Sequence, residues 1–230
     1  MTYLIYDNNI HTWLNERGLV PAESFFQVLR CHAEKYKKEN KLSRIEDVYK
    51  SAGICRSQIH YWESHPYSTQ TKHSYRHKII ANFAELFNLN ETEKEALANS
   101  AGLSLIYGIP SNQSLLFSLY LASLAGDLKR HTGALSNVVS ERMFEYVRKG
   151  IIPTKESALA LGITLDFSLY DLQISLNRAG YALSNSLPND IMIKWILQNN
   201  DKRLSGMELL QSINETLYKY GFPILMTREK

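Results

Sequence analysis

The stretch GICRSQIHYWES, residues 53 to 64, decides the fold of this chain. Its only wholly apolar side chains are Ile54, Ile59 and Trp62, and the last two lie three positions apart. On a helix that spacing places both side chains on one face, which can pack against a core. Arg, Ser, Gln, His and Tyr occupy most of the other positions. The pattern predicts a short helix over residues 56–63 with one buried face and one polar, exposed face.

Gly53 separates this helix from an earlier one with the sequence IEDVYKSA, residues 45–52. Two helices held at a fixed angle by a short turn form a helix-turn-helix, which needs a turn residue that tolerates unusual backbone angles. Glycine meets that need because it lacks a Cβ atom. In the second helix, Arg56 and Gln58 are side-chain types that make paired hydrogen bonds to guanine and adenine edges. The sequence therefore predicts a helix-turn-helix with a polar recognition helix.

The whole chain has 230 residues, of which 44% are hydrophobic and 21% charged, as is typical of a folded protein with one large or two small domains. No apolar run approaches the roughly 18 residues that cross a bilayer, and the start lacks the basic-then-apolar layout of a secretory signal. Cys31 and Cys55 are expected to be reduced small hydrophobes rather than a disulfide framework. We therefore expect a cytoplasmic protein without a membrane segment.

Charge is distributed unevenly along the chain, although the net charge is only +3. Residues 24–80 contain eleven Lys or Arg and five Asp or Glu, whereas residues 81–110 contain one Lys and four Glu. Four of the seven histidines lie between residues 60 and 77. The phosphate backbone of a nucleic acid would select such a basic region, and a solvated helical face is the other interpretation.

Apolar residues recur at spacings of three and four over most of the chain, so the predicted fold class is all-α. Strand-like patterns are limited to TYLIY near the start and SLIYGI at residues 104–109. Polar, Gly or Pro residues bound each helical segment. The predicted helices cover residues 23–38, 44–51, 56–63, 73–87, 91–99, 115–130, 132–137, 141–149, 155–162, 169–178, 190–199 and 205–220.

The chain also contains an internal repeat. The segment AGICRSQIHYWES aligns with NVVSERMFEYVRK, residues 137–149, through matched apolar positions. Downstream, NSAGLSL, residues 99–105, aligns with NRAGYALS, residues 177–184. We interpret this pattern as two tandem units followed by a helical tail. The predicted parts are an N-terminal segment 1–22, a first unit 23–106, a linker 107–114, a second unit 115–184 and a tail 185–230.

The segment AGICRSQIHYWES resembles the turn and recognition helix of the phage-repressor or Cro-like (lambda-repressor-like) helix-turn-helix superfamily. LFNLNETEKEALANSAGLS, residues 86–104, resembles the last two helices of that superfamily. The second unit is similar to a related module through VSERMFEYVRKG, PTKESALAL and RAGYALS, and the tail resembles the closing helices of that module through MIKWILQNN and INETLYKYGFPIL. Together the resemblances cover most of residues 24–225. They imply tandem helical bundles and a sequence-specific DNA-binding protein that regulates transcription.

The resemblance also implies which residues contact DNA. Arg56 and Ser57 begin the recognition helix and Tyr61 lies one turn later, so these three, with the neighbouring Gln58, are expected to contact bases. The candidates for phosphate contacts lie in this helix, in the loop that follows it and in the next helix: His60, Tyr67, Ser68, Lys72, Arg76 and Lys78. In the second unit the candidates for DNA contacts are Arg142, Tyr146, Arg148, Lys149 and Lys155.

Two departures from the superfamily pattern affect these expectations. The first unit carries Tyr49 in the supporting helix where a small residue is usual, so a wider helix crossing is expected. The turn of the second unit is Asn137-Val138 without glycine, and Glu141 and Glu145 are expected to face outward, which is unfavourable beside phosphates. The second unit is therefore expected either to contact DNA or to act as a scaffold that dimerises or binds a partner.

Catalytic and metal-binding functions are not predicted. The sequence lacks GxSxG, HExxH, the phosphate-binding GxxxxGK[ST] and GxGxxG after a strand. His73 and His77 are four residues apart, which is a spacing that can chelate a metal, yet no CxxC or other strong zinc spacing accompanies them. We expect no enzyme activity, no cofactor and no metal.

Double-stranded DNA is the expected partner, bound by a homodimer that acts as a repressor-like regulator. The alternative is a protein-interaction module, such as an antitoxin-like or defence-system accessory subunit, that uses the helix-turn-helix fold to bind a partner protein. Phosphate contacts weaken steeply with added salt, whereas an apolar protein interface hardly responds, so the two hypotheses are separable by experiment.

Overall fold

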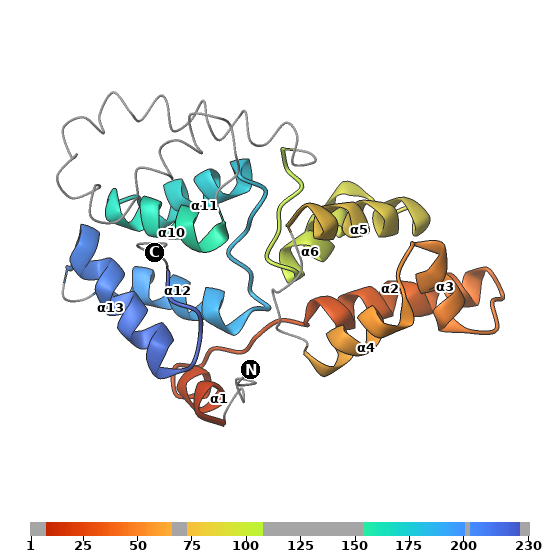
Figure 1. Ribbon diagram of the computed structural model, residues 1–230, viewed down its shortest axis with the longest axis horizontal. Coiled ribbons are helices and arrows are strands. Elements are labelled where there is room, and N and C mark those ends of the chain that lie inside the picture. The colour runs from red at the N-terminus through yellow and green to blue at the C-terminus, as the bar shows by residue number, and fades with distance from the viewer. Residues whose placement is uncertain (1–7, 66–72, 108–153, 201–202, 226–230) are drawn as a thin grey trace.

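The computed structural model describes residues 8–65, 73–107, 154–200 and 203–225, and all regular elements in these ranges are α-helices. They form two lobes, with α2–α6 in one and α1 and α10–α13 in the other (Figure 1). The predicted all-α class is confirmed for this part of the chain. No helix within it is long and apolar enough to cross a membrane. The helices are α1 (Asn8–Asn15), α2 (Phe25–Glu39), α3 (Ile45–Ser51), α4 (Arg56–Ser64), α5 (His73–Leu86), α6 (Glu91–Ser100), α10 (Lys155–Thr164), α11 (Leu169–Arg178), α12 (Pro188–Gln198) and α13 (Gly206–Lys219).

Every predicted helix that falls on described residues is present, with ends shifted by a few residues. The strand-like pattern at 104–109 is wrong over residues 104–107, which form no strand. Only the preceding residue, Leu103, makes an isolated antiparallel bridge, to Tyr181. Helix α1 has no counterpart among the predictions. The helices predicted over 115–130, 132–137 and 141–149, and the strand-like TYLIY, lie outside the described residues.

Side-chain caps explain where several helices begin. The hydroxyl of Ser24 accepts a hydrogen bond from the backbone N–H of Gln27, and the side chain of Gln27 accepts one from the N–H of Ser24 at 2.7 Å. Asn90 and Glu93 form the same reciprocal capping box at the start of α6. Such boxes satisfy N–H groups that have no partner within the helix, so these helix starts are encoded locally.

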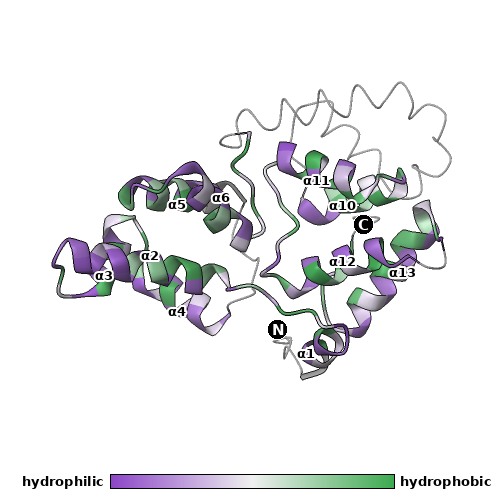
Figure 2. Ribbon diagram, turned by 180° about the vertical axis from the view of Figure 1, so that it is seen from behind, coloured by the Kyte–Doolittle hydropathy of each residue, from purple (hydrophilic) through white to green (hydrophobic). Residues whose placement is uncertain are grey.

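The first lobe buries the inner faces of its short helices in a shared core. Helix α2 packs against α3 and α6, and α5 packs against α6. Phe25 of α2 contacts the ring of Trp62 in α4 with ring centres 5.3 Å apart, and Tyr49 of α3 contacts Phe83 of α5 at 6.3 Å. Figure 2 shows that α3, at the outer end of this lobe, is largely hydrophilic. Because helices this short are marginal alone, such contacts hold α3 and α4 in place.

Tyr49 fills the core of the first lobe and is 2% exposed. Its hydroxyl has no hydrogen-bond partner among the described residues. Burial raises the pKa of this hydroxyl to about 12. A buried polar group without a partner costs folding free energy, so the ring of Tyr49 stabilises the lobe while its hydroxyl opposes that gain.

Replacing Tyr49 by Phe is expected to raise the free energy of unfolding by about 1 kcal/mol at pH 7, because the unpaired hydroxyl is lost and the ring is kept. In the wild type, burial holds the pKa of the folded-state hydroxyl at about 12, above its ordinary value of 10.0, so the unfolded chain ionises first and the wild type loses stability as the pH rises from 10 toward 12, which the Phe variant does not. A shift of that size corresponds to about 2 to 3 kcal/mol. Urea unfolding of both proteins from pH 7 to pH 11 measures the difference, and parallel curves would contradict this role of Tyr49.

The second lobe contains the predicted tail as part of its packed interior. Helix α10 packs against α11 and α13, and α12 packs against α11 and α13. Helix α1 joins this lobe, since Trp13 makes edge contacts with Trp195 at 5.4 Å and with Tyr220 at 6.2 Å. The guanidinium of Arg17 lies 4.2 Å from the centre of the Trp13 ring and 4.9 Å from that of Trp195. Helix α1 is thus held against elements about 180 to 210 residues further along the chain.

The two lobes meet where the chain leaves α6 and α11, along the bridge between Leu103 and Tyr181 (Figure 1). The hydroxyl of Ser186, before α12, donates a hydrogen bond of 2.6 Å to the carbonyl of Glu23, before α2. Buried residues of both lobes belong to one continuous cluster. The lobes are therefore joined by backbone pairing and by a shared core.

Candidate nucleic-acid interface

The turn between α3 and α4 is a helix end closed by glycine. Gly53 has φ of 79°, in the left-handed region. Its N–H donates to the carbonyl of Lys50, and the N–H of Ile54 donates to the carbonyl of Tyr49, both at 3.0 Å. These two bonds form a Schellman motif, which satisfies carbonyls that the helix itself leaves unpaired. Ile54 is 4% exposed and anchors the turn in the core. Gly53 thus occupies the turn position that the sequence pattern assigns to it.

Replacing Gly53 by Ala is expected to lower the free energy of unfolding by about 1 to 2 kcal/mol, since a Cβ atom is unfavourable in the left-handed region. Nothing lies within 4 Å of the position that this Cβ would take, so the loss comes from the backbone alone. Gly53→Asn is the matched control, because Asn tolerates this conformation better, and it should lose less. Urea unfolding measures both variants, and an Ala variant as stable as the wild type would contradict the argument.

Helix α4 is anchored by the face that the sequence pattern assigns to the core. Trp62 is 5% exposed and Ile59 is half-buried. Arg56, Ser57 and His60 are exposed. The helix therefore packs on α2 through Trp62 and presents a polar surface that begins at its first residue.

Gln58 and Tyr61, the other two residues expected to contact bases, are half-buried. The ring of Tyr61 stacks on that of His65, with centres 4.6 Å apart and planes at 17°. The Nδ1 atom of His60 lies 3.6 Å from a carboxylate oxygen of Glu63. The structure thus places Arg56 and Ser57 openly on the surface, whereas Tyr61 is partly engaged within its own helix.

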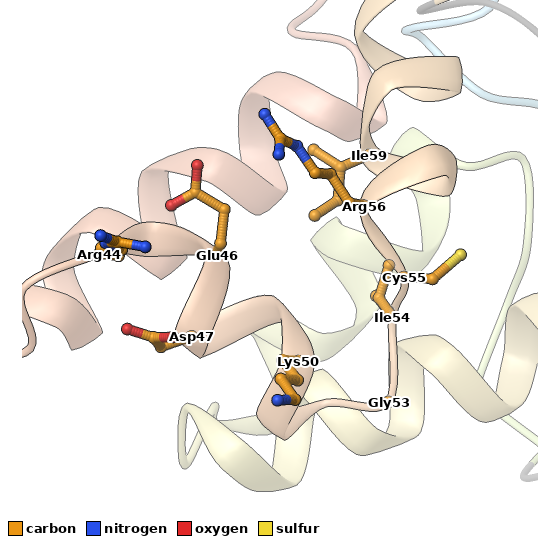
Figure 3. A pocket seen from close by; sticks show the side chains of 9 residues that line it. All are labelled: Arg44, Glu46, Asp47, Lys50, Gly53, Ile54, Cys55, Arg56 and Ile59. Carbon is orange, nitrogen blue, oxygen red and sulfur yellow. The ribbon is translucent and has the colours of Figure 1, made fainter.

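An open groove lies between α3 and the start of α4 (Figure 3). Arg44, Glu46 and Asp47 reach it from the beginning of α3, and Lys50 reaches it from the last turn of that helix. Three basic and two acidic side chains therefore border it, all of them exposed. Its lining residues are Arg44, Glu46, Asp47, Lys50, Gly53, Ile54, Cys55, Arg56 and Ile59.

Arg44 and Lys50 are further candidate contacts that the sequence pattern does not single out. Arg44 is the N-cap residue of the supporting helix and Lys50 lies in its last turn, and the arrangement of α3 and α4 places both along the same groove as Arg56 (Figure 3). The signal in the sequence is weak: each is one basic residue within the basic region 24–80. A phosphate backbone passing over the groove would meet all three cations.

Cys55 and Cys31 are both exposed, which corrects their interpretation as small hydrophobes. Cys55 is the N-cap residue of α4, and its sulfur lies 3.1 Å from the hydroxyl of Ser57. This hydrogen bond lowers the pKa of the Cys55 thiol, with a further contribution from the backbone of Gln58. Ser57 is therefore in contact with a thiol at the helix start as well as exposed to solvent.

The remaining residues of the first unit lie on or before α5. Lys78 is on α5 and is exposed. Arg76 is also on α5, and its side chain lies outside the described residues, as do Tyr67, Ser68 and Lys72. For the second unit, Arg142, Tyr146, Arg148 and Lys149 lie outside the described residues as well.

Lys155 is placed differently from what a phosphate contact requires. Its side chain is 12% exposed, and its ammonium group donates to a carboxylate oxygen of Asp190 at 2.5 Å. Asp190 is fully buried and also accepts a hydrogen bond from the N–H of Ser184 at 2.8 Å. Lys155 is thus an internal ion-pair partner, a role that residue type and spacing do not reveal.

No group of three or more His, Cys, Asp or Glu side chains within the described residues could hold a metal ion. His77 is buried, and its Nε2 atom lies 3.0 Å from the carbonyl oxygen of Gly180. Comparison of the chain with protein-family models, curated proteins and solved structures returns no match.

Proposed function

We propose that this protein binds double-stranded DNA by inserting α4 into the major groove, and that it regulates transcription from a specific site. The observation that carries the proposal is the α3–Gly53–α4 arrangement, in which a buried Trp62 fixes the helix while Arg56 is exposed at its start. Helix-turn-helix proteins place the N-terminal residues of the second helix against base edges. An exposed Arg at that position suits paired hydrogen bonds to guanine.

Affinity in this proposal comes mainly from phosphates, and specificity comes from α4. Arg44 and Lys50 border the groove beside Arg56, and Lys78 is exposed on the following helix. These are suitable phosphate contacts because long cationic side chains reach the backbone on either side of the groove that a helix enters. Arg56, Ser57, Gln58 and Tyr61 would supply the contacts to bases.

The second candidate function is a protein-interaction module. It is favoured by one observation: Glu46 and Asp47 border the same groove and are exposed. Carboxylates repel phosphates, whereas a mixed-charge groove suits a protein segment that carries both signs.

A titration of random-sequence duplex by fluorescence anisotropy at 50 and 200 mM salt tests the proposal. Four neutralised phosphates would weaken binding about a hundredfold between these two concentrations. Selection and sequencing of the bound pool should then enrich one motif. Absence of binding at the lower salt concentration would exclude DNA as the partner and leave the protein-interaction module.

Replacing Arg56 by Ala is expected to weaken binding to the selected sequence by about 1 to 3 kcal/mol and to relax preference at one base position. The matched control is Lys78→Ala, which should weaken binding to selected and random duplexes by the same factor. Anisotropy titrations of both variants on both duplexes measure the four ratios. Equal losses on the two duplexes for Arg56→Ala would show that Arg56 contacts phosphate rather than a base.

A further inference from the structure

The downstream parts of the two repeat copies, α5–α6 and α10–α11, correspond to each other at a separation of 78 residues. Asn88 and Asp166 both have positive φ, at 49° and 55°. Two residues later, Asn90 and Ser168 are the N-caps of α6 and α11. Both helices end at a glycine with positive φ, which is Gly102 in the first copy and Gly180 in the second. The unit formed by α5 and α6 therefore has a structural counterpart in α10 and α11.

The contacts between these two copies are reciprocal. The N–H of Ser104 donates to the carbonyl of Gly180, and the N–H of Ala182 donates to the carbonyl of Gly102, both at 3.0 Å. Ser104 and Ala182 are counterparts at the 78-residue separation, as are Gly102 and Gly180. In one bond the first copy donates and the second accepts, and in the other bond the second copy donates and the first accepts. Such exchange is the defining property of a two-fold, isologous interface.

A second pair of contacts has the same symmetry. His77 of α5 lies against Gly180, with its Nε2 atom 3.0 Å from the carbonyl oxygen. Its counterpart 78 residues later, Lys155 of α10, lies against Gly102, since the ammonium nitrogen is 2.9 Å from the position of an added Cβ. Two different side-chain types therefore occupy equivalent places around one pseudo-two-fold axis, which passes through the bridge between Leu103 and Tyr181.

We infer that the chain is a covalent pseudo-dimer at this face: its α10–α11 pair occupies the place that the α5–α6 pair of a second copy would take in a homodimer, and the face is closed to other chains. The face is buried, with His77 and Ser104 at 0%, Leu103 at 1% and Tyr181 at 8% exposure. A tethered unit is present at an effective concentration of the order of millimolar, so it outcompetes free copies. The expected homodimer is thus replaced, at this surface, by pairing within one chain.

One consequence rests on the proposed function. If the chain binds DNA, one chain should saturate one duplex, because the pairing that would bring a second chain to the same site is already made internally. Titration of a selected duplex at concentrations far above the dissociation constant gives this stoichiometry. A break at one chain per duplex is expected, and a break at two would overturn this consequence.

Cross-linking tests the inference itself. Leu103 and Tyr181 face each other in a non-hydrogen-bonded antiparallel pair, whose Cα atoms lie about 4.5 Å apart, within the range for a disulfide. Leu103→Cys and Tyr181→Cys are combined in a chain in which Cys31 and Cys55 are changed to Ser. After oxidation, the expected product is a disulfide within one chain of about 26.4 kDa on non-reducing electrophoresis, at every protein concentration. A band of twice that mass, or no disulfide, would overturn the inference.

Two controls keep the outcome interpretable. The pair Leu103→Cys and Tyr218→Cys, the latter at a position 79% exposed, should give no cross-link within the chain. In the second control, one chain carries only Leu103→Cys and another carries only Tyr181→Cys, so a disulfide can form only between two chains. No disulfide is expected in this mixture, and a disulfide would show that the chains pair with each other at this face and would overturn the inference. Loss of DNA binding in all assays, with the intrachain disulfide formed, would refute the proposed function and leave the pseudo-dimer standing.

Discussion

Replacing Lys155 by Met is expected to lower the free energy of unfolding by about 3 to 5 kcal/mol, because it leaves a charged carboxylate buried without its cation. The carboxylate belongs to Asp190, which is fully buried. One of its oxygens accepts from Lys155 and from the N–H of Ser184, and the other has no partner among the described residues. A methionine of similar length would fill the space of the lysine stem without neutralising the charge.

Lys194 is a second cation that interacts with Asp190, but its hydrogen bonds to other groups oppose its replacing Lys155 as the partner of this carboxylate. Its ammonium group donates to the side chain of Asn185 and to the carbonyl of Leu183. Burial lowers the pKa of Lys194, while Asp190 acts in the opposite direction. Moving this group to Asp190 would break both hydrogen bonds, so the loss in the Lys155 variant should remain large.

Two controls distinguish the cost of an uncompensated buried charge from the cost of removing a lysine side chain. Asp190→Asn added to Lys155→Met removes the uncompensated charge and should recover most of the stability. Lys94→Met breaks the surface pair with Glu91, whose charged atoms are 2.7 Å apart, and should cost less than about 1 kcal/mol. Urea unfolding at pH 7 measures all three. A Lys155 variant no less stable than the Lys94 variant would refute the structural role of the buried pair.

Replacing Trp62 by Ala is expected to cost about 3 to 5 kcal/mol, because the indole is the largest buried side chain of α4 and leaves a cavity beside Phe25. Trp62→Phe keeps an aromatic ring against Phe25 and should lose less. Tyr218→Ala is the control for aromatic removal at an exposed position, and it should change stability by no more than about 0.5 kcal/mol. Unfolding curves of the three variants measure these differences.

The Trp62 variant also tests whether the packing of α4 controls the proposed binding to DNA. Where the folded form of Trp62→Ala still predominates, a displaced α4 should weaken binding to selected and random duplexes together, since phosphate and base contacts both depend on its position. This differs from Arg56→Ala, which should affect the selected duplex more. A Trp62→Ala protein that binds both duplexes as tightly as the wild type would show that α4 is not the element that contacts DNA.

Short-range rules in the sequence predict much of the first lobe. The spacing of Ile59 and Trp62 predicts the buried face of α4, and both side chains are placed as expected. Gly53 is predictable as the turn residue because its backbone conformation is unfavourable for other residues. The capping residues Ser24 and Asn90 act on N–H groups three positions away, so they mark helix starts without reference to the rest of the chain.

Other features follow only from the way that the helices dock. Helix α1 has eight residues and is marginal alone, and it is stabilised through Trp13 by rings that lie far along the chain. Lys155 is a residue type that often contacts phosphates, yet in the structure it pairs with Asp190, which lies 35 residues away on another helix. The local sequence does not predict this pairing, because whether a side chain is buried or exposed depends on which face of its helix packs against the neighbouring helices.

The sequence by itself therefore determined the helical class, the turn at Gly53 and the buried face of α4, since each depends on residues within a few turns of one another. The tertiary structure alone decided that the segments after α6 and α11 pair reciprocally at Leu103 and Tyr181, that Tyr49 is enclosed and that Lys155 is internal. These outcomes depend on contacts between residues distant in sequence, whose energies are set by the burial and pairing that only the assembled core provides.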